Sequence, residues 1–380
     1  MNFDKVLNPE RLNKYIDLIH AQNKQTQRLD GWFIAKEIMM NTLKQLDSAL
    51  TPAARQAALL EAVVKEIPIK IRNGEIFAGT EADAFACSYA LINPAFRVES
   101  FEGYCDENAV YNDITPNEEF NAERIDTVRK FWSEHLYTKS LSRIYKDSGL
   151  ETREVVYFVE RVTGHTIPDF RDALKLGIDA LISEIEARKK QLPDKADYFD
   201  AMSKSLRTAV ILAERYAESA EKMAAGETDD VRRAELELIA ATCRRVPRLG
   251  ARSLYEAIQS YIILWQVMNL EQLPNPFAFS VGNLDRVLQP FLDMHELDHD
   301  LAAQLLRHFL AFFCVGDRNW AISQNIIVGG MDENGDDLTN EMTYIILRAF
   351  ALSNYSQPNL SLKLHPGTPN EVYQATAGFM

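Results

Sequence analysis

The sequence has few cysteines, and their spacing argues against two classes of protein. Four cysteines occur among 380 residues, namely Cys87, Cys105, Cys243 and Cys314. No two of them stand close together, so neither a CxxC zinc or redox motif nor a disulfide framework is indicated. We therefore expect reduced thiols and no cysteine-bound metal ion.

Basic residues and long apolar runs are also scarce. The chain has 41 Lys and Arg against 55 Asp and Glu, a formal net charge of −14, whereas nucleic-acid binding requires basic patches. No uncharged apolar stretch reaches the about 20 residues that cross a bilayer, and no secretion signal or glycine-rich phosphate loop is evident. The composition predicts a cytoplasmic globular protein that binds neither nucleic acid nor membrane.

The first two-thirds of the chain carries helical patterns. Thr51 and Pro52 are typical of a helix start, and this helix can extend to about Glu66. Further helices are predicted over residues 30–46, 121–145, 153–162, 170–191, 197–225, 229–245 and 253–270. The segment 197–245 predicts a long helical hairpin. The irregular, aromatic-rich stretch 82–116 is typical of a loop that walls a cavity.

The pattern changes near residue 275. Strands are predicted over residues 277–282, 323–330 and 360–364, and helices over 301–315, 339–352 and 368–380. Strands that alternate with helices indicate a parallel sheet. We therefore predict an α/β fold with two regions, a mainly helical region over residues 1–274 and the start of an α/β sheet or barrel over 275–380.

Several short motifs follow one another in a definite order. They are Gly164-His165-Thr166, Arg215-Tyr216-Ala217, Arg232-Arg233-Ala234-Glu235-Leu236, Val246-Pro247, Ala257-Ile258-Gln259, Gly282-Asn283-Leu284-Asp285, Gly329-Gly330, Asn340-Glu341 and Pro358-Asn359-Leu360-Ser361. Taken together, they resemble the first half of a glycyl radical enzyme, the pyruvate formate-lyase family. The resemblance covers roughly residues 50–380 and is strongest after residue 155.

The resemblance implies both a fold and a chemistry. The fold is a ten-stranded α/β barrel assembled from two half-barrels, of which this chain would supply the first, residues 275–380, and its helical surround. An activase with S-adenosylmethionine and an iron–sulfur cluster makes a glycyl radical, which oxidises a cysteine to a thiyl. The thiyl abstracts hydrogen from a small organic substrate in lyase, dehydratase or decarboxylase reactions of anaerobic metabolism. Such enzymes are commonly homodimers.

The radical residues of that family are missing from this sequence. No C-terminal Arg-Val-x-Gly-Tyr motif occurs, and none of the four cysteines has the context of the thiyl residue, although Cys105 lies in a predicted loop. Three explanations remain, namely a truncated chain, one subunit of a split enzyme, and a non-catalytic binding or scaffold relative. We expect a truncated chain, because it ends inside the helix predicted over 368–380. By itself it should be inactive, with no cofactor bound directly.

The resemblance also points to substrate-binding residues. They are His165, Ser280, Phe277, Tyr157 and Tyr104. The family histidine at His165 faces substrate and can hydrogen-bond a hydroxyl, whereas the residues alone favour a core histidine that is hydrogen-bonded to backbone groups. Phe277 stands where some dehydratases carry an acid, which favours a bulkier or aromatic substrate.

Two further expectations follow from the sequence. The family loop carries an Arg and a Gln where this chain has Asn283 and Arg286. We therefore expect a structural ion pair or an end-capping contact at this loop to be altered. An open half-barrel should expose a broad apolar sheet face between residues 275 and 365, whereas a non-catalytic relative should not. A weaker alternative is a metal hydrolase that uses His295 and His299, four residues apart on one helix face.

Overall fold

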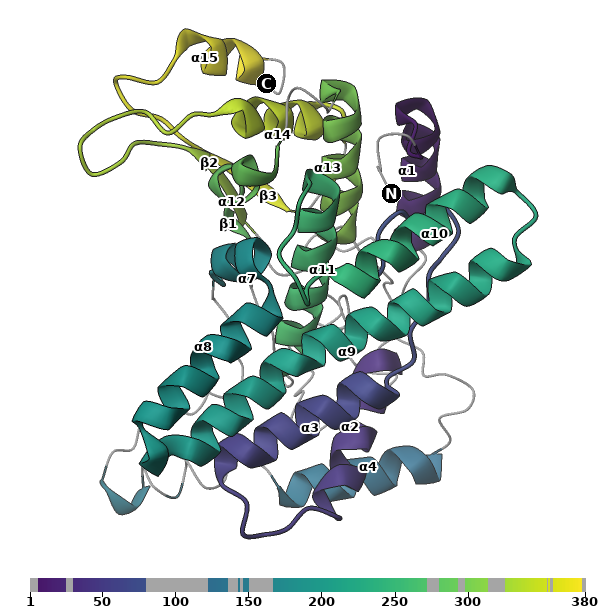
Figure 1. Cartoon of the computed structure of the whole chain (residues 1–380), viewed down its shortest axis with the longest axis vertical. Helices are drawn as coiled ribbons and strands as arrows, with labels where there is room; N and C mark the ends of the chain where they lie inside the picture. The colour runs from purple at the N-terminus through teal and green to yellow at the C-terminus, as the bar shows by residue number, and fades with distance from the viewer. Residues whose placement is uncertain are drawn as a thin grey trace.

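The computed structural model shows a helical region and an α/β region (Figure 1). It describes residues 6–24, 30–79, 122–135, 143, 146–149, 167–271, 280–292, 298–313, 325–353, 355 and 358–377. In the helical region lie α1 (Pro9–Lys24), α2 (Asp30–Leu43), α3 (Pro52–Glu66), α4 (Ala122–Glu134), α7 (Arg171–Leu176), α8 (Ile178–Gln191), η3 (Pro193–Lys195), α9 (Ala196–Gly226), α10 (Asp230–Arg245) and α11 (Leu254–Glu271). In the α/β region lie β1 (Gly282–Asn283), α12 (Leu284–Leu288), η4 (Gln289–Phe291), α13 (His299–Phe313), β2 (Asn325–Gly329), α14 (Glu341–Ala351), β3 (Asn359–Lys363) and α15 (Asn370–Thr376).

The helices α9 and α10 form the predicted hairpin and lie side by side (Figure 1). The carboxylate of Asp229 starts α10 by accepting hydrogen bonds from the backbone N–H groups of Val231 and Arg232, at 2.9 and 3.4 Å. Helix α3 also packs against α9. The hydroxyl of Thr51 caps α3 at 3.3 Å from the backbone nitrogen of Ala54, as the sequence predicts.

The helix predicted over residues 170–191 is divided at Gly177. This glycine has a φ of +86°, and a Cβ there would lie 2.4 Å from the carbonyl carbon of Leu249. Glycine is therefore required both by the left-handed backbone and by the close approach. The carbonyl of Pro247 accepts a hydrogen bond from the backbone N–H of Ile178 at 2.9 Å, so a distant segment holds the start of α8. The prediction of one continuous helix was wrong because this contact leaves no local pattern.

Helix α11 runs through the core of the molecule. The fully buried ring of Trp265 packs edge-to-face against Phe312 and Phe313 of α13, with ring centroids 5.3 and 5.4 Å apart. One apolar cluster includes residues of α3, α9, α10, α11, α13, α14 and β2. The two regions therefore share a core, and the boundary between residues 274 and 275 stays a prediction. Within the described ranges, no helix is both long and apolar enough to cross a membrane.

Strands β1, β2 and β3 form a parallel sheet in chain order, which confirms the predicted alternation of strand and helix. Gly282 pairs with Ile326, and Ile326 pairs with Leu360 on the other side. Successive side chains of a strand point to opposite faces. Ile326 and Val328 are fully buried, so their face of the sheet packs on the helices.

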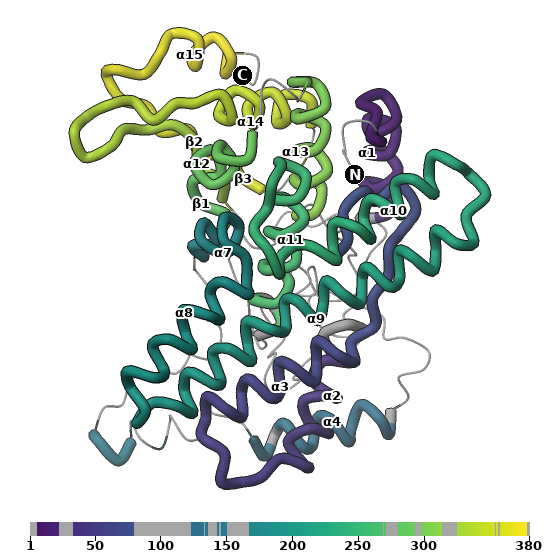
Figure 2. The backbone as a smooth tube through the Cα atoms, viewed as in Figure 1, coloured from purple at the N-terminus to yellow at the C-terminus, as the bar shows by residue number. Residues whose placement is uncertain are grey.

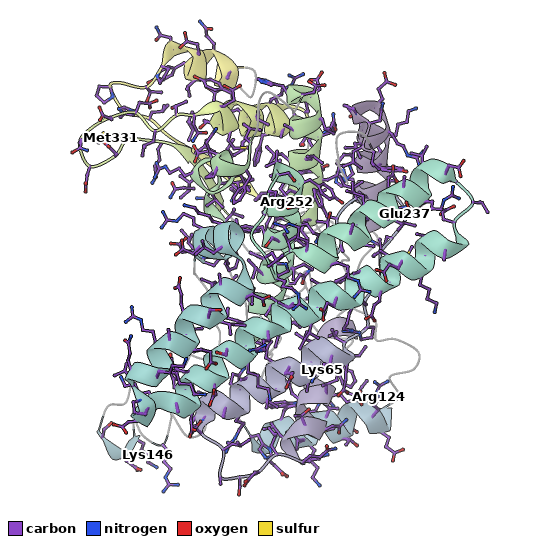
Figure 3. All side chains as sticks on the ribbon, in the orientation of Figure 1. Lys65, Arg124, Lys146, Glu237, Arg252 and Met331 are labelled. Carbon is purple, nitrogen blue, oxygen red and sulfur yellow. The ribbon has the colours of Figure 1, made fainter. Side chains whose placement is uncertain are left out.

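The opposite face of the described strands is mostly polar. Its side chains are those of Asn283, Asn325, Ile327, Asn359, Ser361 and Lys363. Two large apolar residues near the sheet are exposed, namely Met331 at 55% and Leu364 at 52%. Met331 lies on the loop after β2 (Figure 3), and Leu364 directly follows β3. The broad apolar face expected for an open half-barrel is not found in these strands, because short amide and hydroxyl side chains occupy it.

Helix α1 joins the two regions. Figure 2 shows this N-terminal helix near α10 and α13. Arg11 forms ion pairs with Asp229 and Glu235 at 3.0 and 2.9 Å. On the other side, Nε2 of His308 in α13 donates a hydrogen bond to the carbonyl of Leu12 at 3.1 Å. The contacts of α1 thus hold the helical hairpin against the α/β region.

Candidate functional site

The structure describes one of the five residues predicted to bind substrate, Ser280. The other four, His165, Phe277, Tyr157 and Tyr104, lie outside the described residues, so their placement stays a prediction. Ser280 stands two residues before β1 and is partly exposed. The candidate site is therefore defined by Ser280 and the residues that it contacts.

A hydrogen bond connects Ser280 to β2, and a second one connects β2 to β3. The backbone N–H of Asn325, the first residue of β2, donates to Oγ of Ser280 at 3.2 Å. Oγ of Ser361 in β3 donates to the side-chain oxygen of Asn325 at 3.0 Å. We call Ser280, Asn325 and Ser361 the polar row. Sequence reasoning missed Asn325 and Ser361, because the pairing register that brings them to Ser280 is not a local pattern.

The first described residue after the Gly164-His165-Thr166 motif is Ile167. Ile167, the residue that follows the motif, lies directly against Gly282 of β1. A Cβ on Gly282 would lie 2.5 Å from Cγ2 of Ile167, and Gly282 also has a φ of +74°. A larger residue would displace Ile167 as well as strain the backbone. The contact places Ile167 against β1, two residues after Ser280 in the sequence.

Asp285 holds the loop that follows β1. Its side chain is fully buried, and Oδ2 accepts hydrogen bonds from the backbone N–H of Gly329 at 2.7 Å and the hydroxyl of Thr343 at 2.8 Å. Oδ1 accepts a further bond from the backbone N–H of Arg286 at 2.8 Å. Burial raises the pKa of Asp285, and the hydrogen bonds offset part of that rise. The carboxylate fastens the end of β1 to the end of β2 and the start of α14.

Asn283 and Arg286, the two loop residues that differ from the family pattern, have different environments. The guanidinium of Arg286 donates to the carbonyl of Gly329 at 2.8 Å, so it caps the end of β2. The side-chain oxygen of Asn283 is buried, and no described residue donates a hydrogen bond to it. Because an unpaired buried acceptor is costly, this oxygen requires a donor that the described residues do not supply.

The motifs of the helical region contact an extended segment, residues 67–79. The guanidinium of Arg232 donates to the backbone carbonyls of Arg72 and Glu75 at 3.3 and 2.9 Å. It also pairs with Glu235 at 3.1 Å, and both side chains are at least 94% buried. Burial of such a charge requires this complete pairing.

Gln259 and Arg215 bind the same segment at other points. The side chain of Gln259 accepts a hydrogen bond from the N–H of Ala78 at 2.8 Å and donates one to its carbonyl at 2.9 Å. Arg215 donates to the carbonyl of Ile67 at 2.7 Å, and burial lowers the pKa of Arg215. The described contacts of these motif residues are with the protein backbone, which gives them a structural role.

The weaker candidates do not form a metal centre in the described part of the chain. No group of three or more His, Cys, Asp or Glu side chains suited to a metal ion occurs there. Nε2 of His299 lies 3.3 Å from a carboxylate oxygen of Glu341, while His295 lies outside the described residues. Cys243 is fully buried in α10, and burial raises its pKa to about 12. It therefore stays a protonated, unreactive thiol at neutral pH.

Comparison with known proteins gives matches along most of the chain. A family model described as pyruvate formate lyase-like matches residues 8–380. Trans-4-hydroxy-L-proline dehydratase from Clostridioides difficile is 27% identical over 366 residues, covering 88% of this chain and 46% of that protein. Isethionate sulfite-lyase from Bilophila wadsworthia (strain 3_1_6) is 25% identical over 281 residues, covering 64% of this chain and 34% of that protein. The chain spans half or less of the length of these curated relatives.

Solved structures of glycyl radical enzymes have a similar fold. The glycerol-bound B12-independent glycerol dehydratase from Clostridium butyricum matches with a TM-score of 0.79 at 24% identity, covering 97% of this chain and 49% of that one. A glycyl radical enzyme from Archaeoglobus fulgidus matches with a TM-score of 0.80 at 22% identity, covering 95% and 49%. At these identities the likeness shows a shared fold, extending over about half of each larger protein.

Proposed function

Because the chain belongs to the pyruvate formate lyase-like family, we propose that it is the N-terminal part of a glycyl radical lyase, dehydratase or decarboxylase. Its curated relatives include a hydroxyproline dehydratase and an isethionate sulfite-lyase, which supports this range of reactions. Its substrate is a small organic molecule bound at the α/β region. The proposed setting is anaerobic metabolism in the cytoplasm.

In this proposal, β1, β2 and β3 are the first strands of a ten-stranded α/β barrel. Their parallel order and the helices packed on one face support it. The remaining strands come from a second half, either in a longer form of this polypeptide or in a partner chain, because the chain spans about half of its relatives. The completed enzyme is proposed to be a homodimer.

The proposed substrate contacts are His165, Ser280, Phe277, Tyr157 and Tyr104. The observation that carries this assignment is the contact between Ile167 and Gly282. His165 precedes Ile167 by two residues, and two residues of extended chain span at most about 7 Å. Ser280 precedes Gly282 by the same number. These short spacings support the proposal that His165 and Ser280 contact the same substrate.

The radical chemistry is assigned to other parts of the enzyme. A radical S-adenosylmethionine activase with an iron–sulfur cluster is proposed to install the glycyl radical in the second half, which also carries the reactive cysteine. Cys243, the cysteine that the structure describes, is a buried thiol in a helix and fits no such role. This chain has no catalytic residue of its own in the proposal. It binds the substrate and shields it from water.

The first test is the intact mass of the protein purified anaerobically from its source organism, followed by electron paramagnetic resonance after treatment with an activase. We expect a mass well above 43.2 kDa or a tightly bound second chain, together with a glycyl radical signal. His165→Ala should keep the radical signal and lose turnover, since His165 is proposed to contact substrate. A chain of 43.2 kDa without partner or radical would contradict the proposal.

The second candidate function is a non-catalytic binding or scaffold relative. The mostly polar open face of the described strands favours it, because no broad apolar surface there requires a second half-barrel. The same purification separates the two candidates. An unpartnered chain that forms no radical supports the scaffold, whereas a stable complex with a radical supports the enzyme.

A further inference from the structure

We propose that His308 is a pH-sensitive switch that releases α1 from α13 in mild acid, while the helical hairpin of α9 and α10 stays folded. The contact that it controls is the hydrogen bond from Nε2 of His308 to the carbonyl of Leu12, at 3.1 Å. The inference does not depend on the proposed function, because it concerns the junction of the two regions and not the strands of the sheet.

The surroundings of His308 favour its neutral form. Its side chain is buried, and so is the guanidinium of Arg307, the residue before it. Arg307 donates hydrogen bonds to Asn13 of α1 and to Gln304, and no carboxylate among the described residues pairs with it. A proton on His308 would therefore add a buried charge beside one that has no counterion. Burial, and then the charge of Arg307, lower the pKa of His308 to about 4.

A small cavity borders His308 at the junction of three segments. Its volume of about 10 Å³ has room for about one water molecule, and its lining includes Ile19 of α1 and the ion pair of Arg72 with Glu75. Because Nε2 of His308 carries the proton that is donated to Leu12, Nδ1 is the atom that takes up a proton. Glu75 is a poor counterion for it, since Arg72 already contacts both carboxylate oxygens, at 2.7 and 2.6 Å.

The other elements packed against α13 also leave a charge on His308 uncompensated. The helix makes charged contacts with α14 through His299 and Asp300, which lie eight or more residues before His308, about 12 Å along the helix. Toward α11, it packs against the ring of Tyr261, a phenol whose pKa burial raises, so that it stays neutral. His20 of α1 lies outside the lining of the cavity. Separation of α1 from α13 is therefore the way for a protonated His308 to reach water.

The remaining contacts of α1 do not respond to pH in the same range. Leu12, Ile16 and Ile19 are buried apolar side chains, whose contribution does not depend on protonation. Arg11 holds α1 against α10, and its hydrogen bond to Asp229 lowers the pKa of that carboxyl, so this pair persists at pH 5. These contacts keep α1 in place at neutral pH, and His308 alone among them takes up a proton on mild acidification.

The sign and size of the effect follow from the two forms of His308. With α1 in place, His308 binds a proton only near pH 4, whereas in the open form it binds one near the ordinary pKa of about 6.5. Opening therefore takes up a proton between these values and becomes more favourable as the pH falls. The opening equilibrium of α1 should rise about twentyfold from pH 7 to pH 5.

Hydrogen exchange of the full chain at pH 7 and pH 5, corrected for the intrinsic exchange rates, tests the switch. Peptides of α1 should lose about twentyfold in protection at pH 5, while those of α9 keep theirs. His308→Gln retains a donor for the carbonyl of Leu12 but has no titrating group, so the protection of α1 should become independent of pH. His20→Gln is the matched control, because it removes a histidine of α1 itself, and it should keep the pH response.

Two results would overturn the inference. Equal loss of protection in α1 and α9 would mean that acid opens the whole fold and not this junction. A response that persists in His308→Gln, or that disappears in His20→Gln, would assign the effect to another group. Thermal unfolding at pH 7 shows whether each variant folds. The comparison of α1 with α9 in the unmodified chain needs no variant, so it decides the question even where His308→Gln unfolds.

Discussion

The two regions satisfy their buried polar groups in different ways. In the helical region, the extended segment 67–79 belongs to no strand pair, so its carbonyls require side-chain donors such as Arg232 and Gln259. In the α/β region, the strands pair with one another, and the side chains of Asn325 and Ser361 hydrogen-bond to each other across the sheet. Side-chain donors thus satisfy the backbone of the segment 67–79, whereas the strands satisfy backbone groups by pairing with one another.

The strongest test of this comparison is the substitution Arg232→Ala. It removes the guanidinium that Glu235 and the carbonyls of Arg72 and Glu75 share, while Arg11 and Tyr15 still contact Glu235. Loss of one partner of a buried ion pair costs about 3–5 kcal/mol of unfolding free energy, and the remaining partners of Glu235 place the expected loss at the lower end of that range. Denaturant-induced unfolding measures this loss. We expect the segment that carries Arg72 and Glu75 to lose protection from hydrogen exchange as well.

Arg233→Ala is the matched control, one residue away on the same helix. Arg233 pairs with Asp230, and both side chains are exposed, so the substitution should change stability by about 0.5 kcal/mol or less. Equal losses for the two arginines would show that burial of the Arg232 pair does not set its contribution, and the contrast between the regions would fail.

The next largest effect is the pH dependence from His308, which joins the regions through α1. Burial lowers the pKa of His308 to about 4, against an ordinary value near 6.5. Between these values the unfolded chain binds a proton that the folded chain does not, so stability falls as the pH falls from about 6.5 to 4. The full shift corresponds to about 3 kcal/mol. Denaturant unfolding at pH 7, 6 and 5 measures the slope.

His308→Gln isolates this contribution from the other titrating groups. Glutamine can still donate to the carbonyl of Leu12 but takes up no proton in this range. The difference in stability between the two proteins should therefore narrow as the pH falls. A difference that stays constant from pH 7 to 5 would mean that His308 does not titrate with a lowered pKa.

In the α/β region, Asp285→Ala should cost about 2–3 kcal/mol. The substitution leaves the backbone N–H of Gly329 without its side-chain acceptor and removes the shorter hydrogen bond that the hydroxyl of Thr343 donates. A double-mutant cycle with Thr343→Val tests the cause, because removing that hydroxyl should cost less once Asp285 is gone. Additive losses would show that the two side chains do not act together. Asp336→Asn, on an exposed turn, serves as the neutral control.

Local features of the fold could be predicted from the sequence, and long-range ones could not. The start of α3 was predicted correctly, because its capping residues Thr51 and Pro52 are neighbours in the chain. The break at Gly177 depends on a segment about 70 residues away, near Leu249, so the pattern of residues 170–191 does not reveal it. Helix propensity and capping depend on residues that are neighbours in the chain, whereas tertiary contacts cause exceptions such as the break at Gly177.

The candidate site shows the same division. Ser280 could be proposed from its place between a predicted strand and a loop and from the resemblance to a known family. Asn325 and Ser361 could not, because a register shift of one residue would turn them to the other face. Asp285 stood in a recognised motif, yet its partners Gly329 and Thr343 lie 44 and 58 residues away. Only the assembled sheet shows what its carboxylate holds.

The smallest predicted effects come from the helix caps, which compare a single side-chain hydrogen bond at a helix start in each region. Thr51→Ala in α3 and Asn340→Ala in α14 each remove a side-chain acceptor at a helix start and should each cost about 1 kcal/mol. Asn340 accepts from the backbone N–H of Thr343, whose hydroxyl donates to Asp285.

The two caps should therefore respond differently to loss of Asp285. In an Asp285→Ala background, Asn340→Ala should cost less than it does alone, because the hydroxyl of Thr343 no longer holds the start of α14 against the sheet. The cost of Thr51→Ala should not change, since its cap bond to Ala54 shares no partner with Asp285. Denaturant unfolding of the two double mutants measures both couplings. If both cap substitutions cost the same with and without Asp285, the cap of α14 would be as independent of the sheet as the cap of α3. The coupling around Asp285 would then extend no further than Thr343.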